Sequence, residues 1–149
     1  MRRAFILLVI SVAATACVEE PDVGTPLRAV CDGTDSDPSR AVSYATDIDA
    51  AIFHGGPHCV RCHTPGFGTP IGVTLGGLDI SSLEQLRHGG VQSGESLIMP
   101  GDPCGSVLVQ KIGASPPFGA RMPLDGPPYV DPAKVQIIKD WIAEGAHAN

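Results

Sequence analysis

Cys59-Val60-Arg61-Cys62-His63 is the most informative stretch of this 149-residue chain. Two thiols three positions apart lie on the same side of a helical turn, and a histidine follows the second thiol directly. Each thiol can add across one vinyl group of a haem, and His63 can then reach the iron as the proximal ligand. This spacing is the signature of c-type haem attachment. We therefore expect one covalent haem c, held by Cys59, Cys62 and His63.

Two other interpretations of the motif remain open. A thioredoxin-like redox pair needs a βαβ setting, which the hydrophobic pattern of this chain does not predict. A zinc site needs four ligands, and the chain has one Cys-x-x-Cys pair, which Cys31 with Cys104, or His58, could complete. A zinc- or disulfide-stabilised protein without haem is therefore an alternative.

The composition limits the fold and the partners. Eighteen Gly and 14 Pro argue against a long-helix bundle. The net charge of −6 argues against a nucleic-acid partner, which calls for basic patches. Aromatic residues make up only 5% of the chain. These values predict one small domain that needs a disulfide, a metal or a cofactor for its stability.

The N-terminus predicts export. A basic start (residues 1–3) precedes an apolar stretch (4–14), which is too short to cross a membrane as a helix. We expect a signal peptide over residues 1–16. The junction at 14–17 resembles a bacterial lipoprotein signal, in which Cys17 becomes the lipidated first residue; ordinary cleavage nearby is the alternative. The expected location is the periplasmic face of a bacterial membrane, with the choice between outer and inner membrane left open.

Two regions follow the signal. Residues 17–43 are polar and rich in turn-forming residues, so we expect a tether that leads into the domain, with its Asp and Glu side chains only solvated. Residues 44–149 show helical periodicity, and no segment alternates strictly over five or more residues. The sequence therefore predicts one all-α domain.

Four short helices are expected in this domain, and the glycine-rich stretch 64–77 is expected to be loop. The first helix carries Ile48, Ala51 and Ile52. The second covers 82–87, opened by a capping box formed by Ser81 and Glu84, and the third covers 106–112, opened by Ser106 or Gly105. The last is capped by Asp131, has Pro132 at its first position, places Val135, Ile138 and Ile142 on one face and ends at Gly145.

Four further stretches are informative beyond the Cys-x-x-Cys-His motif: Pro100-Gly101-Asp102-Pro103, Ser106-x-Leu108, Arg121-Met122-Pro123 and Trp141-Ile142-x-x-Gly145-Ala146. With these stretches, the region from 44 to 146 resembles the small cytochrome c domains of large bacterial exported proteins, which are similar to class I cytochromes c. That resemblance implies few short helices and long loops wrapped around one haem, a Met-Pro ligand late in the chain, and a terminal helix packed across the first. Cys104 departs from many relatives.

The sixth iron ligand has several candidates. Met122 precedes Pro123, which fixes the backbone beside a ligand, and we expect Met122 in this role. Met99 has the same Met-Pro dipeptide and is the alternative, although it ends an apolar run and is expected to pack in the core. The remaining candidates are His54, His58, His88 and His147.

Cysteine accounting leaves one further pair. With Cys17 assigned to lipid and two cysteines to haem, Cys31 and Cys104 remain, in an oxidising compartment. We expect a disulfide between them, with two free thiols as the alternative. Three arginines, Arg61, Arg87 and Arg121, could pair with haem propionates, and a solvated position is the alternative for each.

The expected function is one-electron transfer outside the cytoplasm by a membrane-tethered single-haem cytochrome. Ligation by His63 and Met122 fills both axial positions, which favours an electron carrier over an enzyme. Whether it serves as a subunit of a larger oxidoreductase stays open. A haem peroxidase or a gas-binding haem sensor with an open sixth site is the alternative. The acidic chain favours a basic redox partner protein, and we expect no small-molecule substrate.

Overall fold

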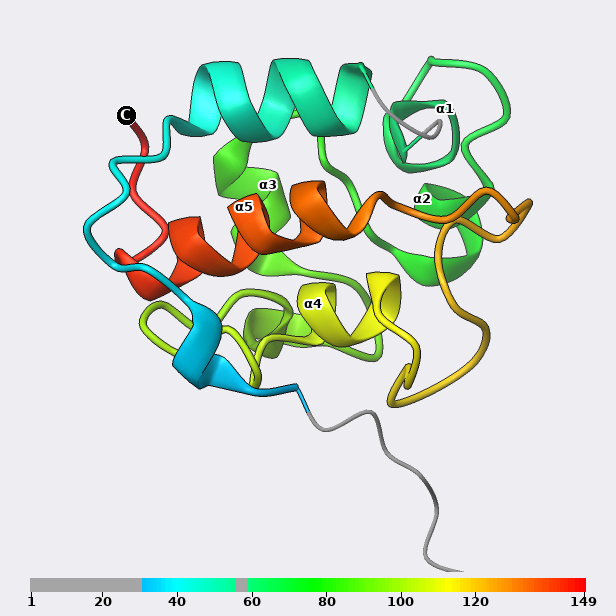
Figure 1. Ribbon diagram of the computed structural model, residues 1–149. Coiled ribbons are helices and arrows are strands. Elements are labelled where there is room, and N and C mark those ends of the chain that lie inside the picture. The colour runs from blue at the N-terminus through cyan, green and yellow to red at the C-terminus, as the bar shows by residue number, and fades with distance from the viewer. Residues whose placement is uncertain (1–30, 56–58) are drawn as a thin grey trace, which may run out of the picture.

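Helices are the only regular elements in residues 31–55 and 59–149, the part of the chain that the computed structural model describes. This confirms the all-α class. None of the helices in these ranges is long and apolar enough to span a membrane. The elements are η1 (Gly33–Asp35), η2 (Tyr44–His54), α1 (Cys59–His63), α2 (Ile71–Gly76), α3 (Leu83–His88), η3 (Gly94–Leu97), α4 (Val107–Ile112) and α5 (Pro132–Ala143) (Figure 1).

Helix η2 is a π-helix that follows the cap residue Ser43. Its wider turn begins where the Ile48 amide donates to the Ser43 carbonyl over 3.3 Å, five residues back. Because of this spacing, Ile48, Ile52 and Phe53 are buried, whereas Ala51 is exposed. The expected helix is present, but Ala51, which was expected on its apolar face, is exposed.

Helix α5 packs beside η2 in the centre of the molecule (Figure 1). It begins as expected, with the Asp131 carboxylate accepting the Ala133 amide over 2.8 Å and Pro132 in the first turn. Trp141 is fully buried, and its ring lies 5.5 Å from that of Tyr44. The first and last long helices thus share one core.

Two expectations about local structure are wrong. Residues 71–76 form helix α2 instead of loop, because Thr74 donates through its hydroxyl to the Pro70 carbonyl and Gly77 closes the helix with φ +64°. Helix α3 is capped by Ser82, whose hydroxyl accepts the Gln85 amide, and not by the expected Ser81 box. The Ser81 amide instead donates to the Asp79 carboxylate.

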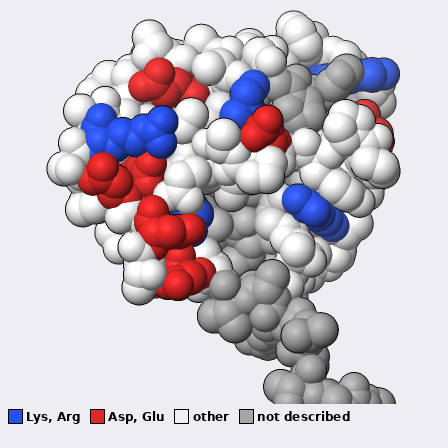
Figure 2. All heavy atoms as spheres, in the orientation of Figure 1, with Lys and Arg blue, Asp and Glu red and all other residues white. Residues whose placement is uncertain are grey.

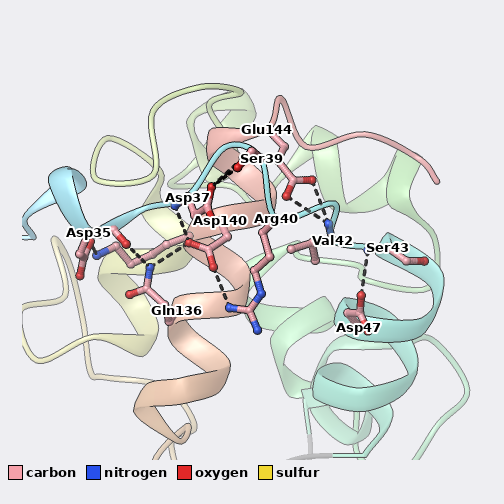
Figure 3. A network of polar contacts seen from close by, with 11 residues as sticks. Asp35, Asp37, Ser39, Arg40, Val42, Ser43, Asp47, Gln136, Asp140 and Glu144 are labelled. Atoms are coloured by element: carbon pink, nitrogen blue, oxygen red, sulfur yellow. Dashed lines mark hydrogen bonds and ion pairs between the residues drawn. The ribbon is translucent and has the colours of Figure 1, made fainter.

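The segment 31–43 lies against α5 through a polar network (Figure 3). Buried Asp140 accepts hydrogen bonds from the Asp37 amide (2.9 Å) and the Arg40 guanidinium (2.8 Å). Asp35 forms an ion pair with Lys139. The expectation that the carboxylates of this segment are only solvated is therefore wrong for Asp35, because α5 presents a buried ammonium to it. Acidic and basic groups lie side by side on this face (Figure 2).

A disulfide joins Cys31 to Cys104, with the two Cα atoms 5.4 Å apart. The disulfide connects the start of the described chain to the turn before α4. Ser106, at the end of this turn, is fully buried. The Ser106 hydroxyl accepts the Met99 amide (2.8 Å) and donates to the Asp102 carbonyl (2.8 Å). Because the Ser106 hydroxyl makes its hydrogen bonds within this turn, it does not cap α4. The helix therefore begins at Val107 without a side-chain cap.

Candidate haem-attachment site

Helix α1 presents both motif cysteines within one turn, and its buried residue Val60 anchors it in the core. Cys59 packs against the core, and burial raises the pKa of its thiol to about 11. A thiol of this kind stays protonated at neutral pH, whereas a thioredoxin-type redox pair needs a lowered thiol pKa. The burial of Cys59 therefore disfavours the redox-pair interpretation.

His63 is oriented by the backbone of a later segment. Its Nδ1 atom lies 3.3 Å from the carbonyl oxygen of Leu78. A carbonyl can only accept, so Nδ1 carries the proton and Nε2 keeps its lone pair for a metal. Partial burial lowers the pKa of His63, which favours the neutral ring that binds iron. A histidine ligand is commonly fixed by this type of bond from its other nitrogen.

Helix α2 provides the surface on which the His63 ring rests. A Cβ atom at Gly72 would overlap that ring, so any larger residue there would displace the His63 side chain. The Leu78 amide donates to the Gly72 carbonyl over 3.2 Å, and the Ile80 amide donates to the His63 carbonyl over 2.8 Å. Gly72 and Leu78 are site residues that the sequence reasoning missed.

Met122 lies half-buried in the long connection between α4 and α5 and packs against the core. Its amide donates to the Lys111 carbonyl at the end of α4, over 2.8 Å. The connection and helices α1 and α2 lie at the same end of the molecule in Figure 1. After burial, the positive charge of Lys111 is a further cause of the lowered pKa of His63. The residue that anchors Met122 is therefore within electrostatic range of the His63 ring.

Met99 does not pack in the core as expected, because 39% of its surface is exposed. The two residues before it, Leu97 and Ile98, fill the core, and the turn that begins at Met99 directs its side chain outward. His54, His88 and His147 are exposed, and His54 pairs with Asp49 at 3.1 Å. Cys17 and His58 lie outside the described residues.

The three arginines have different surroundings. Arg61 is exposed. Arg87 donates to the Ala146 carbonyl over 2.6 Å. Arg121 donates to the Ile112 carbonyl over 3.0 Å, and its guanidinium lies 4.0 Å from the centre of the Tyr129 ring. Arg87 and Arg121 therefore hold backbone segments together, which a simply solvated arginine would not do.

The residues around the motif fit a haem. The Thr64 hydroxyl, next to His63, is buried and finds no hydrogen-bond partner in the described ranges, so a bound group could satisfy it. Large apolar side chains are exposed on the segment after the motif and on the segment after Met122. Small soluble proteins use such exposed side chains to bind ligands or partners. The exposed side chains are Phe67, Ile71 and Leu75 after the motif, and Leu124 and Tyr129 after Met122.

The zinc interpretation loses two of its candidate ligands. Cys31 and Cys104 are joined to each other and therefore supply no thiolate to a metal. Across residues 31–55 and 59–149, no group of three or more His, Cys, Asp and Glu side chains is arranged to hold a metal ion.

Compared with protein-family models, curated proteins and solved structures, the chain gives no match.

Proposed function

We propose that this protein is a membrane-tethered, single-haem c-type cytochrome that carries single electrons outside the cytoplasm. The observation that carries the proposal is the hydrogen bond from His63 Nδ1 to the Leu78 carbonyl. This bond leaves Nε2 as the atom that can bind iron. His63 follows Cys62 directly and lies on the same helix as Cys59. Two thiols and an oriented neutral imidazole on one helix are the donor set that a covalent haem requires.

Four residues of the chain would hold the haem. Cys59 and Cys62 would form the thioether links to the haem, and His63 would be one of the two protein ligands of its iron. Met122 would be the second ligand, through a soft thioether sulfur that favours ferrous iron and raises the reduction potential. The haem would supply a one-electron Fe(III)/Fe(II) couple. With both ligands supplied by side chains, oxygen and peroxide would find no open site on the iron, so the proposed role is that of a carrier and not of an enzyme.

The proposed setting follows from the N-terminal sequence and the charge. A lipid on Cys17 would tether the domain to a bacterial membrane. The net charge of −6 favours a basic redox partner protein through long-range attraction. Fractionation tests the tether. The wild type should partition into detergent, and Cys17→Ala should be released or left unprocessed, whereas a wholly soluble wild type would show plain signal cleavage.

The visible spectrum of the purified holoprotein, oxidised and reduced, tests the function. We expect a six-coordinate, low-spin haem in both states and no binding of carbon monoxide by the reduced protein. A protein that binds carbon monoxide readily and turns over peroxide would be the haem enzyme or sensor. A colourless protein that retains zinc would support the haem-free alternative.

A further inference from the structure

Lys111 makes three hydrogen bonds to the short segment 118–122. Its ammonium donates to the Phe118 carbonyl over 2.8 Å and to the Ala120 carbonyl over 2.5 Å. Its own carbonyl accepts the Met122 amide over 2.8 Å. A single residue at the end of α4 therefore binds this segment through both its side chain and its backbone.

The surroundings of the ammonium are shaped for this contact. The Phe118 ring centre lies 4.9 Å from Nζ, within the range of a cation–π interaction. Gly119 turns the chain between the two acceptor carbonyls with φ +55°, a conformation that favours glycine. Lys111 itself is half-buried, and burial lowers its pKa. Its charge is thus partly withdrawn from water and directed at backbone carbonyls, where hydrogen bonds to a charged group are strong.

We propose that Lys111 is a positioning residue for Met122: its ammonium closes segment 118–122 against α4 and so holds the methionine in place as the sixth ligand. This inference rests on the proposed function. Lys111 touches neither haem nor partner in this role, and it acts through the loop that it binds.

Removing the ammonium separates its effect from that of the backbone bond. In Lys111→Met the apolar stem and the bond from the Met122 amide are retained, but the Phe118 and Ala120 carbonyls lose their common donor. The segment then opens more often, and each opening exposes the iron. Lys111→Arg restores a charged donor with two or more N–H groups, and Lys111→Gln restores a neutral one.

The experiment measures carbon monoxide binding to reduced holoprotein, together with the reduction potential and the far-ultraviolet circular dichroism. We expect Lys111→Met to bind carbon monoxide about tenfold faster than the wild type, at a lower potential and with unchanged helix content. Lys111→Arg should restore most of the wild-type behaviour, and Lys111→Gln should fall between. Lys134→Met is the matched control, because Lys134 also donates to a backbone carbonyl, that of Ala51, over 2.8 Å.

Each outcome is decisive. A Lys111→Met protein with the wild-type rate and potential, or a Lys134→Met protein with the same changes, overturns the positioning role and leaves the proposed function standing. If Lys111→Met loses its helix content, the folded Lys111→Gln and Lys111→Arg proteins decide in its place, and equal rates in both and the wild type overturn the role. A wild type whose spectrum is unchanged by Met122→Ala overturns the Met122 assignment and this inference together.

Discussion

His63 and Leu78 are joined by a hydrogen bond of 3.3 Å, from the Nδ1 atom of the ring to the backbone carbonyl. Fifteen residues separate the two positions, and helix α2 folds within that interval. The bond selects one tautomer of the ring, and the absence of a side chain at Gly72 gives the ring room against α2. The ring of His63, the proposed iron ligand, is therefore oriented by a segment that lies outside the Cys-x-x-Cys-His motif.

Gly72→Ala should disturb this arrangement. The added methyl group overlaps the His63 ring, and overpacking of this kind costs about 2 kcal/mol of unfolding free energy. We expect a lower yield of holoprotein and a weakened axial bond, visible as high-spin features in the ferric spectrum. Gly76→Ala is the control in the same helix, because a Cβ there meets no atom within 4 Å. It should be neutral or stabilising by up to about 1 kcal/mol. Equal behaviour of the two variants would contradict the role of Gly72.

Met122→Ala should open the sixth coordination position. The ferric haem should become high-spin or water-bound, the potential should fall, and the reduced protein should bind carbon monoxide. Met99→Leu should leave the spectrum unchanged and the stability within about 0.5 kcal/mol of the wild type, because Met99 is exposed. If Met99→Leu loses the low-spin spectrum while Met122→Ala keeps it, the two assignments must be exchanged.

The disulfide should contribute much of the stability. It closes a loop spanning 73 positions between Cys31 and Cys104, which corresponds to about 4 kcal/mol in the chain-entropy treatment. The variant with Cys31→Ser and Cys104→Ser should lose an amount of that order in denaturant unfolding, and reduction should have no further effect on it. Modification of both cysteines by a thiol reagent in the unreduced, unfolded wild type would refute the disulfide.

Asp140 should make the stability depend on acid pH. Burial alone would raise the pKa of Asp140, but hydrogen bonds from the Asp37 amide, Arg40 and Gln136 lower it below the ordinary 3.8. The carboxylate therefore contributes stability above pH 3.8, and this contribution is lost as the pH falls through its lower folded-state pKa. Asp140→Asn should cost about 2 kcal/mol at neutral pH, and the difference from the wild type should shrink below pH 3.8. A difference that stays constant across this range would contradict the assignment.

Helices with strong local signals could be predicted from the sequence. In α5, Asp131 and Pro132 define the start and the burial of Ile138 and Ile142 follows from their spacing of four residues. Helix α4 could also be predicted, because its apolar run ends at Gly113. In these cases the residues that cap the helix and the residues that face the core lie within the same short window.

The missed features depend on contacts between distant segments. Glycines 72 and 76 predict a break in helical structure, although residues 71–76 form α2, in which Gly72 leaves room for the His63 ring. The Leu78 acceptor is a backbone carbonyl, which every residue carries, so no side chain marks it in the sequence. Met99 follows two buried residues, and only the turn stabilised by Ser106 shows that its own side chain leaves the core.

The covalent attachment of haem to α1 is the central claim, and intact-mass measurement after acid–acetone extraction tests it most directly. Protein made with a cytochrome c maturation system should keep its red colour through the extraction and carry the mass of one haem. The variant with Cys59→Ser and Cys62→Ser should lose both. Wild-type protein that loses its colour to the solvent and shows the mass of the polypeptide alone would contradict the account.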